Sequence, residues 1–160
     1  MDIRIGIGID AHRLVEGLPL WLGGVEIPHS YGLEAHSDGD VISHAILDAL
    51  LGAADLGDKG QLFPPTDDTY KNIRSTQLLH ASMAKLRQAG LAIGNIDVSV
   101  MCEEPQLQPH IQSMKHALAR AMSIQPEQVS IKGTTLEHLG FTGRKEGIAA
   151  LAIVALKKLL

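Results

Sequence analysis

Two segments place aspartate and histidine inside otherwise apolar runs, at spacings that suit metal binding. Asp10 and His12 are two residues apart in a predicted strand, so their side chains point to the same face. His44 lies inside a predicted helix that begins near residue 37. Two ligands from a strand and one from a helix can form a three-ligand site with an open fourth position, which is the arrangement of catalytic Zn²⁺ sites.

Two carboxylates share a helix face with His44. Asp40, His44 and Asp48 follow one another at intervals of four residues. Either carboxylate, one turn away from His44, is expected to orient its imidazole, as partners of metal-ligating histidines do. Taken alone, an Asp-x-His pair is commonly a surface feature and a helix histidine is commonly a core residue, so the metal prediction depends on the three residues meeting.

Two further segments suit phosphate. The segment "AHSDGD" places His36 and Ser37 at the predicted helix N-terminus, where free N–H groups and the helix dipole favour an anion. Ser37 with Asp40 also resembles a capping box, and a cap alone is the alternative explanation. The predicted loop 133–147 combines hydroxyls, glycines and cations that suit phosphate oxygens, with Glu137 as a ligand for Mg²⁺. The alternative there is a polar surface loop.

Strands and helices alternate along the chain, which predicts an α/β or α+β two-layer fold in one domain, residues 1–160. Pro64 and Pro65 argue against regular structure over residues 62–70. The tail, residues 147–160, has a helix-favouring composition but no clean helical period, so a buried strand is also possible. The other predicted elements are strands at 4–12, 95–101 and 129–132, a hairpin at 20–27 around Gly23-Gly24, and helices at 37–54, 75–89 and 109–122.

Composition limits the classes of function. The formal net charge is −4 and aromatic residues make up 3% of the chain, which argues against a nucleic-acid-binding surface. A phosphate ligand would therefore need metal ions to neutralise its charge. The single cysteine, Cys102, excludes an internal disulfide and fits a reducing compartment. No apolar run suits a bilayer and no targeting segment is recognised, so we expect a cytoplasmic protein without membrane contact.

Four segments, in order, resemble the 2-C-methyl-D-erythritol 2,4-cyclodiphosphate synthase family. They are "RIGIGIDAHRL", "GLEAHSDGDVISHAILDALLGAADLGDKGQLFPPTD", "NIDVSVMCEEPQLQPHI" and "IKGTTLEHLGFTGRKEGIAALAIVAL". The resemblance implies conversion of 4-diphosphocytidyl-2-C-methyl-D-erythritol 2-phosphate to the cyclic diphosphate and CMP, in non-mevalonate isoprenoid biosynthesis. It thus implies a phosphorus–oxygen lyase.

The resemblance also assigns roles to residues. It implies Zn²⁺ on Asp10, His12 and His44, and Mg²⁺ or Mn²⁺ on Glu137. It implies that His36 and Thr135 steady the transition state. Ribose, erythritol and phosphate contacts are implied for Ser37, Asp58, Gly60, Phe63, Asp67, Phe141 and Arg144, and a cytidine pocket for Cys102, Pro105, Leu107, Gly133 and Thr134.

For the fold, the resemblance implies a mixed four-stranded sheet with helices on one face, and a homotrimer with active sites between subunits. It makes the tail a strand, against its composition. Gln106, Pro65 and Lys145 depart from residues found in other members, and none is a proposed metal ligand.

Two other functions fit the same residues. A metal-dependent phosphohydrolase would use water as the nucleophile and release an opened phosphate. A trimeric binding module without activity would be expected to have lost metal ligands, which are intact here.

Overall fold

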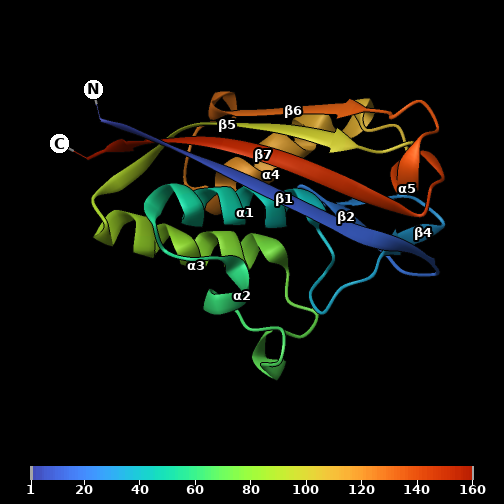
Figure 1. Ribbon diagram of the computed structural model, residues 1–160, viewed down its shortest axis with the longest axis horizontal. Helices are drawn as coiled ribbons and strands as arrows, with labels where there is room; N and C mark the ends of the chain where they lie inside the picture. Colours follow the sequence, from blue (N-terminus) through green and yellow to red (C-terminus); the bar gives the residue numbers. More distant parts are fainter. Residues whose placement is uncertain (1, 160) are drawn as a thin grey trace.

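The computed structural model describes residues 2–159, which form a mixed sheet covered by helices on one face (Figure 1). The strand order is β4-β1-β7-β5-β6, and only the β5–β6 pair is parallel. This sheet has five strands, so the prediction of four was wrong. The additional strand is the short β4 at the end of β1. The sheet strands are β1 (Ile3–Glu16), β4 (Tyr31–Leu33), β5 (Leu91–Met101), β6 (Val129–Thr134) and β7 (Gly147–Lys158).

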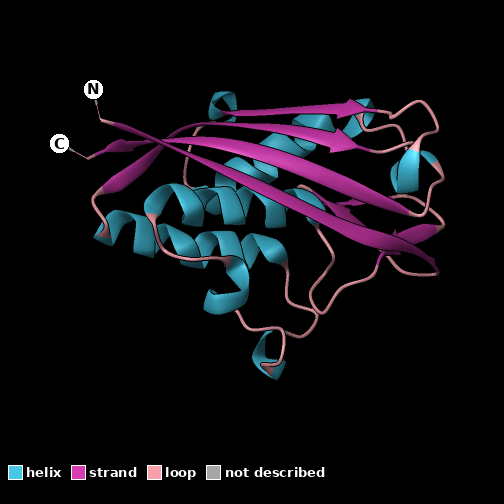
Figure 2. Cartoon of the chain, in the orientation of Figure 1, coloured by secondary structure: helices cyan, strands magenta, loops and turns pink. Residues whose placement is uncertain are grey.

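Three long helices form the second layer (Figure 2). They are α1 (Val41–Ala54), α3 (Ser75–Gln88) and α4 (Ile111–Met122). The predicted hairpin is present as β2 (Leu20–Leu22) and β3 (Val25–Ile27). Shorter elements are α2 (Lys59–Leu62), α5 (Gly140–Gly143) and 3₁₀ turns at Asp68–Tyr70, Gln108–His110 and Pro126–Gln128. The two-layer α/β prediction is confirmed.

The alternation of β1 explains how sheet and helix layer meet. Gly6, Gly8, Asp10 and His12 occupy the face turned toward α1, and the isoleucines between them occupy the other. A Cβ atom on Gly8 would lie 2.0 Å from the carbonyl oxygen of Ala45. The strand and helix backbones therefore touch at this glycine, and the next two inward positions of the strand carry the aspartate and the histidine.

The outer face of β1 is apolar and uncovered within residues 2–159. Ile3, Ile5, Ile7 and Ile9 each expose between 50% and 72% of their surface. Ile7 pairs with Ile153 of β7 in the same sheet, which is also exposed. A continuous exposed apolar strip of this kind is typical of a protein interface.

The structure corrects several element boundaries. Helix α1 begins at Val41 with Asp40 as its N-cap, so the predicted start at Ser37 was wrong, and α4 begins at Ile111 after a 3₁₀ turn that contains Pro109. A 3₁₀ turn lies within residues 62–70, and α5 lies within the predicted 133–147 loop. The tail is the central strand β7, paired with β1 and β5. The backbone hydrogen bonds that β7 forms with both neighbouring strands outweigh the helix propensity of its alanines and leucines.

Candidate functional site

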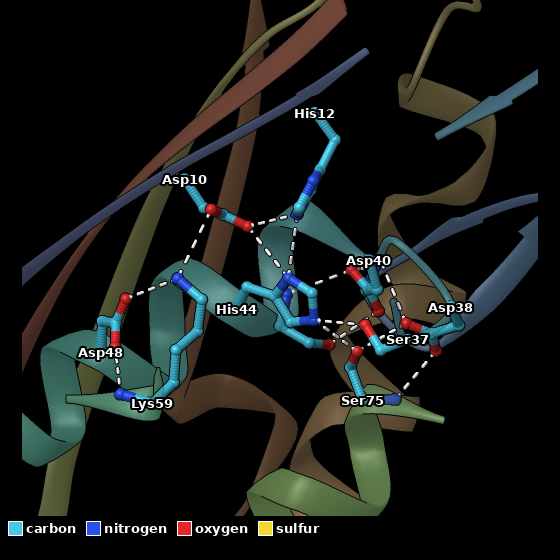
Figure 3. A network of polar contacts seen from close by, with 11 residues as sticks. Asp10, His12, Ser37, Asp38, Asp40, His44, Asp48, Lys59 and Ser75 are labelled. Carbon is cyan, nitrogen blue, oxygen red and sulfur yellow. Dashed lines mark hydrogen bonds and ion pairs between the residues drawn. The ribbon is translucent and has the colours of Figure 1, made fainter. Parts of the chain in front are cut away.

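Asp10, His12 and His44 converge at one point on the helix-facing side of the sheet (Figure 3). The Asp10 Oδ2 atom lies 2.7 Å from His12 Nε2 and 2.9 Å from His44 Nδ1. The two imidazole nitrogens are 3.0 Å apart. Strand alternation brings Asp10 and His12 together, and the close packing of α1 on β1 brings His44 to them. The predicted three-residue cluster is confirmed as a group that can hold a metal ion.

The donor set fits a divalent cation. Ligand atoms about 2.0–2.1 Å from a tetrahedral Zn²⁺ lie about 3.3 Å from one another, slightly farther apart than these three atoms. One carboxylate and two imidazoles are also ligand types that Zn²⁺ accepts. Burial alone would raise the pKa of Asp10, but hydrogen bonds and charge from His12 and His44 hold that pKa well below its usual range. Asp10 is thus a carboxylate ready to bind a cation.

The two carboxylates expected to support His44, those of Asp40 and Asp48, accept hydrogen bonds from other residues. Asp40 is fully buried at the N-terminus of α1, where it accepts hydrogen bonds from the N–H groups of Gly23, Gly24 and Ser43. Asp48 accepts hydrogen bonds from Lys59. The prediction that either one orients His44 was wrong. The Asp40 side chain caps α1 by accepting the N–H of Ser43, so a cap is present at this helix N-terminus, as the alternative explanation required.

Within residues 2–159, two serine hydroxyl groups, and no carboxylate, contact the His44 imidazole on the side away from Asp10. His44 Nε2 lies 2.8 Å from Ser75 Oγ and 3.0 Å from Ser37 Oγ. Ser75 is the first residue of α3, 31 positions along the chain from His44. Sequence reasoning missed Ser75 because no local spacing connects the two residues.

Lys59 is a second residue that the sequence did not indicate. Its Nζ atom lies 2.8 Å from Asp48 Oδ2 and 3.4 Å from Asp10 Oδ1, the oxygen that does not face the histidines. Partial burial lowers the pKa of Lys59, but the two carboxylates outweigh this effect and raise it. Lys59 therefore brings a fixed positive charge to the edge of the metal-ligand cluster (Figure 3).

A cavity opens beside the cluster. Its lining includes His12 and His44 together with four residues expected in the site, which are His36, Ser37, Gly60 and Phe63. His36 Nε2 donates to the backbone carbonyl of Asp67 at 3.2 Å. The Asp67 side chain caps the 3₁₀ turn at Asp68–Tyr70, and the Asp58 side chain caps α2. These two carboxylates hold loops that border the cavity.

The residues predicted to bind cytidine line a separate cavity, which shares no lining residue with the first. It lies between the ends of β5 and β6 and the turn before α4. Burial and the neighbouring Glu103 raise the pKa of Cys102 to about 12, so its thiol is neutral at physiological pH. The lining includes the predicted residues Cys102, Pro105, Leu107, Gly133 and Thr134, and also Thr135.

The remaining predicted residues lie on the loop after β6. Glu137 Oε1 accepts a hydrogen bond from Thr135 Oγ1 at 3.4 Å, and Glu137 is not a member of the metal-ligand cluster. Phe141 is exposed on α5, and Arg144 forms a surface ion pair with Glu146. Within one chain, these residues do not meet the Asp10 cluster.

Comparison with known proteins places this architecture in a family. The model of the YgbB family matches residues 3–157. The chain belongs to the YgbB family. It is 54% identical over 153 residues to 2-C-methyl-D-erythritol 2,4-cyclodiphosphate synthase of Porphyromonas gingivalis, covering 96% of this chain and 94% of that protein.

Solved structures agree with this YgbB assignment. The bifunctional IspDF of Campylobacter jejuni superposes with a TM-score of 0.95 at 45% identity, over 99% of this chain and 43% of that longer chain. The complex of Plasmodium falciparum IspF with CDP gives a TM-score of 0.86 at 33% identity, over 99% and 97% of the two chains. Among residues 2–159, no helix has the length and apolar character needed to cross a membrane.

Proposed function

We propose that this chain converts 4-diphosphocytidyl-2-C-methyl-D-erythritol 2-phosphate to 2-C-methyl-D-erythritol 2,4-cyclodiphosphate and CMP, in non-mevalonate isoprenoid biosynthesis. The observation that carries the proposal is the convergence of Asp10, His12 and His44 beside a cavity, in a chain of the YgbB family. The reaction makes the protein a phosphorus–oxygen lyase. We expect it to act in the cytoplasm.

The reaction is an intramolecular phosphoryl transfer. An oxygen of the 2-phosphate forms a bond to the β-phosphorus, and the bond from that phosphorus to the oxygen bridging the two phosphates breaks. CMP leaves with the bridging oxygen and its electron pair. Such transfers need positioning and charge stabilisation more than covalent help from the protein.

Two cations complete the site in this proposal. Asp10, His12 and His44 hold Zn²⁺, and Glu137 holds Mg²⁺ or Mn²⁺. When bound, these ions polarise the phosphate oxygens and offset the charge that develops on them. The formal net charge of the chain is −4, so bound cations would supply positive charge that the protein as a whole does not carry in excess.

The chain's own residues position the substrate. His36 and Thr135 carry donors that would bind phosphate oxygens as the new bond forms. The ammonium group of Lys59, at the cavity wall beside Asp10, adds a fixed positive charge. Phe63 gives the same cavity an apolar wall, which helps to keep water from competing as a nucleophile.

The location of the two cavities supports a homotrimer with shared active sites. One chain places the metal ligands in the first cavity and the predicted cytidine pocket in the second. The exposed isoleucines of β1 supply an apolar surface for contact between copies. We propose that the metal cavity of one subunit faces the cytidine pocket, Glu137 and Arg144 of a neighbour.

The decisive experiment identifies the product. The protein is incubated with the cytidine diphosphate substrate and Mg²⁺, with and without a zinc chelator, and products are identified by mass and phosphorus NMR spectra. We expect CMP with a cyclic diphosphate, lost on chelation. His44→Ala should abolish both zinc binding and turnover, whereas His116→Ala, on the exposed side of α4, is the matched control. A linear product would instead indicate hydrolysis.

A further inference from the structure

The nitrogen of His44 that faces away from the metal ligands is enclosed by polar groups. Its Nε2 atom lies 2.8 Å from the Oγ atom of Ser75, which is 1% exposed. Ser75 Oγ lies in turn 2.5 Å from Asp38 Oδ1 (Figure 3). A buried chain of contacts thus runs from a candidate metal ligand, through a hydroxyl, to a carboxylate.

The direction of each hydrogen bond follows from counting donors. Two side-chain groups and two backbone groups donate to the Asp38 carboxylate. They are the Oγ and N atoms of Ser75, the N atom of Asp40 and the Nε atom of Arg74. A carboxylate has about four acceptor positions and no proton of its own, so its capacity is filled by these four donors.

The Ser75 hydroxyl therefore donates its single proton to Asp38. Its oxygen then offers only lone pairs to His44, so the 2.8 Å contact with Ser75 is favourable only when Nε2 carries a proton, which Ser37 Oγ, 3.0 Å from the same nitrogen, can also accept. The opposite tautomer would set the lone pairs of nitrogen and oxygen against each other. When a cation lies between Nδ1, Asp10 and His12, the tautomer protonated at Nε2 would offer it the Nδ1 lone pair, as a metal ligand must; without the cation, Nδ1 lies 2.9 Å from the Asp10 carboxylate and donates to it.

Asp38 is itself fixed by an aromatic support. The Arg74 guanidinium carbon lies 3.3 Å from the centre of the Trp21 ring, and the same side chain donates to the carbonyl oxygen of Gly24. Arg74 is the N-cap residue of α3, so one side chain joins the β2–β3 hairpin, the start of α3 and the loop of Asp38. This support restricts the carboxylate that receives the Ser75 proton.

We propose that Ser75 is a positioning residue that fixes the tautomer and orientation of His44 for metal binding, with Asp38 and Arg74 as its support. The proposal rests on the metal site of the proposed function. Ser75, Asp38 and Arg74 are not in the lining of the cavity beside the metal ligands, and the proposal assigns Ser75 a role that sequence spacing did not reveal. Loss of such a partner typically weakens metal binding by about 10- to 100-fold.

The test compares zinc affinity among three variants of the full chain. Zinc is added to chelator-stripped protein in competition with a metal indicator. We expect Ser75→Ala to bind about 10- to 100-fold more weakly than wild type. Ser75→Thr keeps the hydroxyl and should bind within a few-fold of wild type. Ser82→Ala removes another buried hydroxyl of α3, one that donates only to the Leu79 carbonyl, and should leave affinity unchanged.

A second measurement needs no variant of Ser75. Nitrogen NMR of the zinc-loaded protein, with His44→Ala used to assign the signal, reports which imidazole nitrogen of His44 carries the proton. We expect the proton on Nε2, and a proton on Nδ1 would overturn the proposal. Unchanged zinc affinity in Ser75→Ala would also overturn it. If wild-type protein fails to bind zinc, the metal site of the proposed function itself is refuted.

Discussion

Gly8 offers a direct test of how packing creates the metal-ligand cluster. In Gly8→Ala, the new Cβ atom would lie 2.0 Å from the Ala45 carbonyl oxygen and 2.7 Å from the Ala49 nitrogen. Non-bonded Cβ contacts essentially never fall below 3.0 Å, so α1 and β1 must separate locally by about 1 Å. Both contacts are to backbone atoms, which cannot move aside as a flexible side chain would.

The expected magnitude follows from that shift. Overpacking of this kind costs about 1–3 kcal/mol in the free energy of unfolding. Ala45 is adjacent to His44, and Gly8 precedes Asp10 by two residues, so the same shift separates metal ligands that tolerate only about ±0.2 Å. A misplacement of about 1 Å can cost about 100-fold in activity. We therefore expect loss of both stability and turnover.

The assay combines urea unfolding of the zinc-free protein, at one fixed protein concentration, with turnover of the zinc-loaded protein. Gly52→Ala is the matched control, because Gly52 is an exposed position of α1 where a Cβ meets nothing within 4 Å. That substitution should stabilise the helix by about 0.5–1 kcal/mol. If Gly8→Ala unfolds at the same urea concentration as wild type and keeps full turnover, close packing at Gly8 does not position the site.

Three further predictions follow from particular groups. Ile7→Asp should convert the proposed trimer to monomer in light scattering, while Ile7→Val retains it; a trimeric Ile7→Asp protein would contradict the interface. The pKa of Cys102 is raised to about 12 from an ordinary 9.0, so between pH 9 and 12 the folded state retains a thiol proton that the unfolded state loses. The free energy of unfolding should therefore fall across this range, by up to about 1.4 kcal/mol per pH unit. Cys102→Ala should show a shallower fall, and equal slopes in denaturant titrations would refute the assignment. Glu137→Gln should weaken Mn²⁺ binding in a paramagnetic resonance titration while zinc content stays constant, and equal Mn²⁺ binding would exclude Glu137 as the second ligand.

Much of the cluster could be predicted because it depends on local periodicity. Alternation along β1 fixes which residues share a face, so Asp10 and His12 had to point together once the strand formed. The small residues Gly6 and Gly8 on that face indicate a close approach of backbone, and α1 makes that approach. His44 joins Asp10 and His12 once α1 packs against that face of β1.

The structure alone decided the partners of the cluster. Ser75 and Lys59 reach His44 and Asp10 through contacts between separate elements, and no spacing in the chain records those contacts. Asp48 has the correct helical spacing to support His44, yet both of its carboxylate oxygens accept hydrogen bonds from Lys59. A helical period places a side chain on a face but does not choose its hydrogen-bond partner.

The tail shows the same division at the level of secondary structure. Residues rich in alanine and leucine favour helix by their intrinsic propensity, which is worth only tenths of a kcal/mol for each residue. In the folded chain, β7 pairs with β1 along one edge and with β5 along the other. These non-local hydrogen bonds and the burial of its inward side chains outweigh the local preference. Sequence by itself thus determined which residues face together, and tertiary structure decided which elements meet, because pairing energy between distant segments exceeds local propensity.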